Sequence, residues 1–208
     1  RLPRCYKAYQ TDHPECAIAS RTVADGVVFG SLHRLQKITD ETICVWADVL
    51  AAVPNSKLLI ARHELGHPAN CKALLARFQA HGIAEHQLIL KGSWQGWHLN
   101  VYNEIDIALD TLPVTGGATT AEALWMGVPV VTLAGGMMRE RISASILRGL
   151  GRSEWVATTK REAIEIASAL ARDLRRPGFS KEGLRQHFIQ SELGDGASLA
   201  TALEDAYC

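Results

Sequence analysis

The sequence predicts an α/β protein in which a parallel sheet is covered by helices on both faces. Short apolar segments alternate with segments of helical periodicity from about residue 26 to the C-terminus. The apolar segments are continuous rather than alternating with polar residues, as in strands that are buried on both faces. At 208 residues the chain is long enough for one domain with a sizeable core, and no internal repeat divides it.

The order of the elements follows from the apolar runs and from the signals that start and stop helices. Residues 40–53, for example, place Ile43, Trp46 and Leu50 on one helical face, with Thr39 as the expected N-cap. Strands are expected at residues 27–29, 57–61, 88–90, 105–109, 128–133 and 155–156. Helices are expected at residues 40–53, 69–81, from Thr119 onward, 139–150, 160–174, 181–191 and 197–207. Residues 1–25 lack a clear period and are interpreted as a linker or wrapping segment, which leaves 26–208 as the folded domain.

Composition argues against several classes of function. Lys and Arg total 22 and Asp and Glu total 22, so the formal net charge is zero and a nucleic-acid partner is not indicated. No apolar run approaches the ~20 residues of a membrane span, and no export leader is expected. The five cysteines are scattered without a Cys-x-x-Cys pair, which favours a reducing, cytoplasmic setting. Cys44 and Cys71 lie in helical patterns and are expected to be small buried residues.

One segment indicates an anion site. Residues 106–131 contain an apolar strand, a Thr/Gly turn, a helix that begins at Thr119 and Thr120, and another apolar strand. The first N–H groups of a helix lack intrahelical partners and carry the positive end of its dipole. Glycines let the backbone approach a ligand closely, and threonine hydroxyls add donors. The segment therefore predicts a phosphate site, beyond the carboxyl ends of the strands where ligands of such sheets bind.

The same segment resembles the nucleotide-sugar half of the O-GlcNAc transferase and SPINDLY glycosyltransferase family. The family signature is much like Asp-Thr-x-Pro-x-Asn-Gly-x-Thr-Thr-x-x-(Asp/Glu)-Ala-Leu-Trp-x-Gly-Val-Pro. This chain departs from it at Thr115, where the family has asparagine, and at Ala118, which replaces the first threonine of the usual run. The resemblance covers the chain from about residue 26 to the C-terminus. It implies a Rossmann-like domain equivalent to the C-terminal half of a GT-B glycosyltransferase.

The resemblance implies phosphate-binding roles for two basic residues. Residues 29–38 resemble the family's Phe-x-x-Phe-Asn-x-x-x-Lys segment, whose lysine binds the donor diphosphate, and Lys37 takes that place here. Arg34 stands where the family often has another polar residue and is a second candidate. A fixed cation stabilises the negative charge that grows on a departing diphosphate. The alternative for both side chains is an ordinary solvated basic loop.

The remaining donor-binding residues also follow from the resemblance. His98, in the loop of residues 93–98, corresponds to a family histidine that lies against the uracil, and Glu122 corresponds to an acidic residue that binds ribose hydroxyls. The alternatives are a packed His98, and a Glu122 in the first turn of its helix that only stabilises the positive end of the dipole. The diphosphate would be held by the glycine turn and the first helical residues: Gly116, Gly117, Ala118, Thr119 and Thr120.

One motif points to a different class of protein. Residues 63–67 satisfy the H-E-x-x-H pattern of zinc hydrolases, in which His63 and His67 bind the metal and Glu64 is the general base. That site needs both histidines on one continuous helix. Pro68 follows at once and biases His67 away from helical geometry. We therefore expect the match to be a coincidence and expect no metal site.

As a member of the family, the chain would be the donor-binding half of an inverting protein O-glycosyltransferase. The full enzyme would transfer N-acetylglucosamine from UDP-GlcNAc to serine or threonine hydroxyls of proteins, without a metal cofactor. The implied partners are the UDP-sugar, the protein acceptor, and the N-terminal catalytic half and TPR repeats of a longer enzyme. The isolated domain is expected to bind UDP but to turn over poorly. A zinc-dependent hydrolase and a non-catalytic nucleotide-binding module are the two alternatives.

Overall fold

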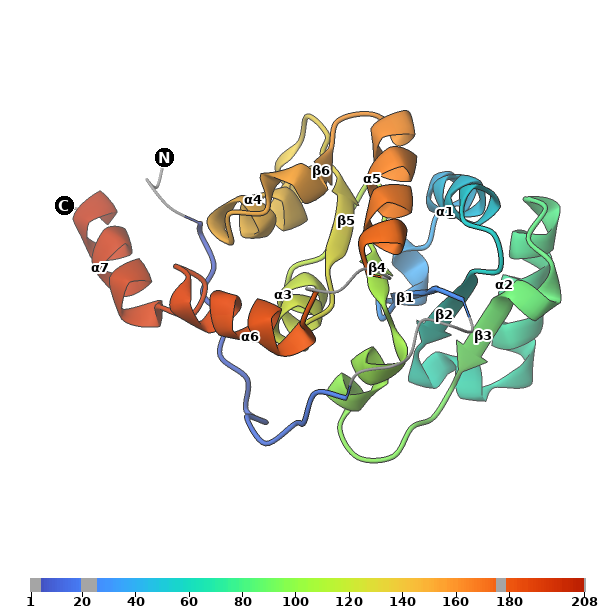
Figure 1. The fold of residues 1–208 in the computed structure, drawn as a ribbon, viewed down its shortest axis with the longest axis horizontal. Helices are drawn as coiled ribbons and strands as arrows, with labels where there is room; N and C mark the ends of the chain where they lie inside the picture. Colours follow the sequence, from blue (N-terminus) through green and yellow to red (C-terminus); the bar gives the residue numbers. More distant parts are fainter. Residues whose placement is uncertain (1–4, 20–25, 175–178, 208) are drawn as a thin grey trace.

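The computed structural model describes residues 5–19, 26–174 and 179–207. It contains a six-stranded sheet with the strand order β3-β2-β1-β4-β5-β6. Each of its described strand pairs is parallel, which confirms the predicted fold class (Figure 1). The strands are β1 (Val28–Ser31), β2 (Lys57–Ala61), β3 (Leu88–Lys91), β4 (Ile107–Leu109), β5 (Val130–Leu133) and β6 (Val156–Ala157).

The helices lie on both faces of the sheet because the chain crosses it in two directions. From β1 the chain moves outward to β2 and β3, and from β4 it moves the opposite way to β5 and β6. Right-handed crossovers therefore place α1 and α2 on one face and α3 and α4 on the other. The contacts agree: α1 packs against α2 and α5, whereas α3 packs against α4 and α6. The helices are α1 (Asp40–Ala52), α2 (Pro68–Ala80), α3 (Ala118–Trp125), α4 (Ile142–Gly149), α5 (Lys160–Asp173), α6 (Lys181–Gln190) and α7 (Gly196–Tyr207).

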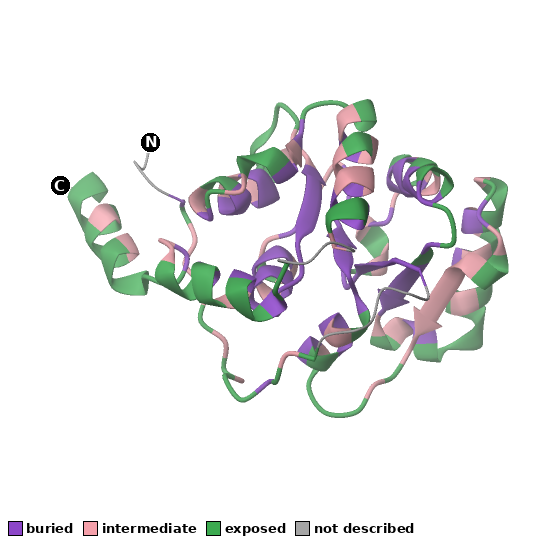
Figure 2. Cartoon of the chain, viewed as in Figure 1, coloured by how far each residue is buried: buried purple, intermediate pink, exposed green. Residues whose placement is uncertain are grey.

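The core consists of the central strands and the helix faces that cover them. Every residue of β1 and β4 is buried, which matches their continuous apolar sequences. The edge strand β3 is only half-buried. Figure 2 shows this gradient, with buried residues along the middle of the sheet and exposed residues on the outer sides of the helices. Among the described helices, none has the length and apolar character that a bilayer-spanning segment requires.

Most predicted boundaries agree with the structure to within a few residues. The Thr39 cap is confirmed, because its hydroxyl accepts a hydrogen bond from Thr42 N–H at 3.1 Å. The helix predicted at residues 139–150 is instead a 3₁₀ turn, Met138–Glu140, followed by α4. The break lies at Arg141, whose φ of −123° and ψ of 6° leave the helical region.

The described part of the N-terminal segment, residues 5–19, forms neither helix nor strand and lies against the C-terminal part of the chain. Tyr9 N–H donates to Leu193 O at 2.8 Å, and Arg185 Nη2 donates to Cys16 O at 3.0 Å. These contacts are those expected of a wrapping segment. The predicted domain boundary at residue 25 lies outside the described residues and stays a prediction.

The expectation for two cysteines was wrong. Cys44 and Cys71 are partly exposed, whereas Cys5 and Cys16 are buried. Cys44 follows the core residue Ile43 directly, so it is turned about 100° away from it around the helix. All four of these cysteines are free thiols.

Candidate functional site

The loop between β4 and α3 is organised by Asp110, which lies directly after the strand. Its Oδ1 accepts hydrogen bonds from Thr111 N–H at 2.9 Å and from Gly116 N–H at 2.8 Å. Its Oδ2 accepts one from the Thr132 hydroxyl at 2.6 Å. Asp110 is only 6 % exposed. The carboxylate therefore folds the loop back on itself and fixes the position at which α3 begins.

His33, which follows β1, joins this network from the neighbouring strand. Its Nε2 lies 3.1 Å from Asp110 Oδ1 and 3.1 Å from the Thr119 hydroxyl. Its Nδ1 lies 2.9 Å from the Ser31 hydroxyl. A carboxylate can only accept, so we assign a proton to His33 Nε2. Burial alone would raise the pKa of Asp110, but the hydrogen bond and charge of His33 outweigh it and lower that pKa.

Neither His33 nor Asp110 is among the residues that the sequence pattern predicts to bind a ligand. Both lie inside the two motifs that carry the family resemblance, and the family segment has asparagine where this chain has His33. A search for the family's residues therefore passes over the histidine. A usable signal exists for Asp110: an acidic residue that ends a buried strand and precedes a glycine turn can accept the N–H groups of that turn.

The helix α3 begins at Ala118, one residue earlier than expected, and Gly117 is its N-cap without a side-chain cap. The first intrahelical bond runs from Ala121 N–H to Gly117 O at 3.1 Å. The N–H groups of Ala118, Thr119 and Thr120 precede that bond, so they lie at the positive end of the helix. The structure thus has a helix N-terminus after the glycine turn, and its use as an anion site stays a prediction.

Two predicted donors are used inside the protein instead. Gly116 N–H is bound to Asp110, as described above. The Thr120 hydroxyl is buried and lies 2.7 Å from Ser143 Oγ, which in turn donates to Gly116 O at 3.0 Å. The Thr120 side chain therefore fixes the turn, and an anion would meet the backbone of Gly117 and the residues that follow it.

Lys37 reaches the same turn from a 3₁₀ helix, Leu35–Lys37, that follows β1. Its Nζ donates to Thr115 O at 2.9 Å. Partial burial lowers the pKa of Lys37, the nearby Asp110 raises it, and the positive Arg34 adds to the lowering. Arg34 is exposed. The structure thus brings Lys37 into direct contact with the backbone of the glycine turn, whereas Arg34 is exposed near Lys37.

Glu122 lies in the second turn of α3, not in the first as expected, because the helix starts at Ala118. A purely dipolar role is weaker at this distance from the helix end. Its Oε1 is 3.4 Å from His98 Nε2, and this hydrogen bond raises the pKa of His98 against the effect of burial. The hydroxyl of Tyr102 donates to Thr119 O at 3.0 Å. The contact between the imidazole and the carboxylate places His98 and Glu122, which are predicted to bind base and ribose, side by side.

The two tryptophans of the loop at residues 93–98 have different surroundings. Trp97 is 49 % exposed, and its ring stacks on His13 with centroids 3.3 Å apart. Trp94 stacks on His63 with centroids 4.0 Å apart. The loop is thus attached to the N-terminal segment on one side and to the region after β2 on the other.

The zinc motif does not have the required geometry. His63–Gly66 is a 3₁₀ helix, and His67 is the extended N-cap of α2, with φ −92° and ψ 121°. The two histidines are therefore not on consecutive turns of one α-helix. Glu64 pairs with Arg62 at 3.3 Å. In the described part of the chain, no group of three or more His, Cys, Asp or Glu residues is arranged to hold a metal.

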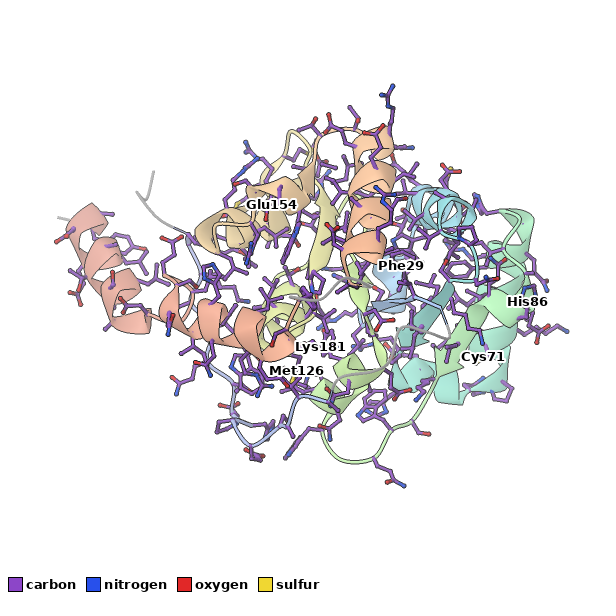
Figure 3. All side chains as sticks on the ribbon, in the orientation of Figure 1. Phe29, Cys71, His86, Met126, Glu154 and Lys181 are labelled. Atoms are coloured by element: carbon purple, nitrogen blue, oxygen red, sulfur yellow. The ribbon has the colours of Figure 1, made fainter. Side chains whose placement is uncertain are left out.

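The backbone that carries Tyr102 is held in place by α6. Lys181 is buried, and its Nζ donates to Ile105 O at 2.8 Å and to Tyr102 O at 3.2 Å. Figure 3 labels Lys181 next to Met126, the residue that follows α3. These bonds connect the 3₁₀ helix His98–Glu104 to the C-terminal helices. The helix α6 therefore anchors the C-terminal part of the 3₁₀ helix that begins at His98.

Comparisons with known proteins agree with these features. Residues 17–202 match the model of glycosyl transferase family 41. The chain is 34 % identical over 212 residues to a protein of Hordeum vulgare named as a probable UDP-N-acetylglucosamine–peptide N-acetylglucosaminyltransferase SPINDLY, and the match covers 100 % of this chain and 22 % of that protein. The SPINDLY protein of Arabidopsis thaliana is 35 % identical over 216 residues, with 100 % and 23 % covered.

A solved structure is also similar to this chain over its whole length. A mutant O-GlcNAc transferase of Thermobaculum terrenum superimposes with a TM-score of 0.84 at 36 % identity, and the match covers 100 % of this chain and 40 % of that one. The chain spans less than a quarter of the length of each of the two plant relatives named above.

Proposed function

Because the chain belongs to glycosyl transferase family 41, we propose that it is the donor-binding half of an inverting protein O-glycosyltransferase. The full enzyme transfers N-acetylglucosamine from UDP-GlcNAc to serine or threonine hydroxyls of proteins. The convergence of Lys37 and the N-terminus of α3 on one glycine turn supports this proposal most directly. A diphosphate fits there because the ammonium and the backbone dipoles both favour negative charge.

The chemical contribution of this half is to stabilise the leaving group. When the bond between the sugar and the diphosphate breaks, negative charge grows on the diphosphate oxygens. Lys37 and the N–H groups of Ala118 to Thr120 are fixed beforehand by the surrounding loop, so they stabilise that charge without rearranging. The lysine and the helix dipole supply the positive charge, and we therefore propose that no metal cofactor is needed. In this proposal Arg34 is an outer, solvent-exposed phosphate contact.

The nucleoside end of the donor would lie against His98 and Glu122. The imidazole offers a flat face to the uracil, and the carboxylate accepts hydrogen bonds from ribose hydroxyls. The loop with Trp94 and Trp97 would form the outer wall of the base pocket. The order along α3, with Gly117 at the start of the helix and Glu122 one turn later, suits a diphosphate that is followed by a ribose.

The remaining machinery is proposed to come from outside this chain. The acceptor protein, an N-terminal catalytic half and TPR repeats are the expected partners of the full-length enzyme. The free thiols of Cys5, Cys16, Cys44 and Cys71 suit the reducing cytoplasm as its compartment.

The proposal is tested by titrating UDP into the purified chain and its Lys37→Ala variant in a calorimeter. Loss of one charge-assisted phosphate contact should cost roughly 1.5–3 kcal/mol, or about 10- to 100-fold in affinity. Lys72→Ala, an exposed lysine on α2, is the matched control and should bind UDP like the wild type. A wild-type chain that binds no UDP would refute the proposal.

The identity of the donor and the activity of the isolated chain are tested separately. A screen of uridine and guanosine diphosphate sugars should show tightest binding of UDP-GlcNAc; tighter binding of a GDP-sugar would assign the site to another donor. The chain alone should not transfer sugar to protein acceptors, because the other half of the site is absent. A full-length enzyme that binds UDP-GlcNAc but never transfers it would instead support the non-catalytic binding module.

A further inference from the structure

The N-terminal segment runs along the candidate donor site. Lys7 lies next to Gly117, since a methyl group built on that glycine would be 3.8 Å from Lys7 Nζ. Further along, His13 stacks on Trp97 of the loop at residues 93–98. Between them, burial and the charge of Glu122 raise the pKa of Tyr9 to about 12. The segment therefore follows the site from the glycine turn to the base-binding loop.

Lys7 lies at the positive end of α3. Its ammonium lies at the N-cap of α3, where the helix dipole is positive. Lys37, a second ammonium, is bonded to Thr115 in the same turn. None of the ion pairs found between described residues involves Lys7. An anion bound at this turn would be attracted by both ammonium groups and by the N-terminus of α3.

We propose that Lys7 is a second cationic ligand of the donor diphosphate, supplied by the N-terminal segment. This inference rests on the proposed function and adds a residue that the family resemblance did not assign. Lys7 approaches beside Gly117, at the N-cap of α3, whereas Lys37 is bonded to Thr115. Two cations at one diphosphate divide its charge between them, so each contributes to holding the leaving group. The N-terminal segment is in this view a wall of the donor site rather than a simple linker.

The experiment compares UDP with uridine, which lacks the phosphates. UDP is titrated by calorimetry and uridine by NMR, into the wild-type chain and into Lys7→Ala, Lys7→Arg, Lys37→Ala and the control Lys72→Ala. Lys7→Ala should weaken UDP binding about 10- to 100-fold and leave uridine binding unchanged. Lys7→Arg keeps the charge and should recover most of the affinity for UDP. Thermal unfolding of each variant verifies that it folds.

The outcomes separate this inference from the function on which it rests. If Lys37→Ala loses UDP affinity while Lys7→Ala binds UDP like the wild type, Lys7 is not a ligand and the proposed function stands. If Lys7→Ala weakens UDP and uridine equally, the lysine only supports the pocket and the inference is wrong. A wild-type chain that does not bind UDP refutes the proposed function and the inference together.

Discussion

Asp110 is buried, yet its pKa is lowered, and its neighbours explain why. The carboxylate accepts hydrogen bonds from two backbone N–H groups, one hydroxyl and the imidazole of His33. A buried charge is tolerated only when such partners replace water. The bonds formed by this one side chain connect the ends of β1, β4 and β5 to the turn before α3. The candidate anion site thus depends on a residue that would not itself touch the ligand.

His98 and Glu122 give a prediction about pH at the residue scale. The pKa of His98 is raised above 6.5, mainly by its hydrogen bond to Glu122. The charged pair therefore stabilises the fold fully below pH 6.5, and this contribution is lost as the pH rises through the higher pKa of the folded state. His98→Gln should cost more stability at about pH 5.5 than at about pH 9. The difference should stay below about 1 kcal/mol, because the side chain is partly exposed.

Urea unfolding of wild type and His98→Gln at both pH values measures this difference. Glu122→Gln should remove the same pH dependence of stability. The variant with both substitutions should lose no more of this pH-dependent stability than either single variant does. A cost of His98→Gln that is equal at the two pH values would show that the pair does not form.

At the scale of an element, the turn before α3 requires glycine at position 116. A Cβ there would overlap the Thr120 hydroxyl and lie 2.8 Å from His33 Nε2. Gly116→Ala should therefore destabilise the protein by about 1–3 kcal/mol, as overpacking does, and should weaken UDP binding by displacing His33. Gly136→Ala is the control, since a Cβ at Gly136 meets nothing within 4 Å.

Denaturant unfolding and UDP titration of both glycine variants test this requirement. Gly136→Ala should stay within about 0.5 kcal/mol of the wild type. A Gly116→Ala protein as stable as the control would mean that the turn can relax without cost.

The elements that the sequence predicted well depend on local signals. The helix at residues 40–53 was predicted from its apolar period and from Thr39, and both signals act within a few residues of the helix start. His33 is not predicted at all and Thr120 is predicted as a ligand donor, because the partners of both residues are distant in sequence. His33 binds Asp110, and Thr120 contacts Ser143, which the sequence pattern does not connect. Local propensity does not reveal which hydroxyl faces the interior.

At the scale of the whole molecule, α7 shows the same difference between local signals and contacts with distant residues. Its helical period is visible in the sequence at residues 197–207, but its surroundings are not. None of its described residues is buried, and Figure 1 shows it extending away from the sheet and from α6. A helix without a buried face receives little stabilisation from packing. In this chain α7 therefore contributes little to the core, whose last buried members are Phe188 of α6 and Leu193.

Truncation after Gly194, which removes α7, should consequently lower the free energy of unfolding by less than about 1 kcal/mol, or shift Tm by no more than about 2–4 °C. Phe188→Ala is the comparison, because that side chain is 1 % exposed; its loss should cost about 3–5 kcal/mol. Thermal unfolding measures both, and UDP titration should show that the truncated chain keeps its affinity, since the candidate donor site lies between α3 and the N-terminal segment. A truncated chain that unfolds as readily as Phe188→Ala would place α7 in the cooperative core, against the burial seen here.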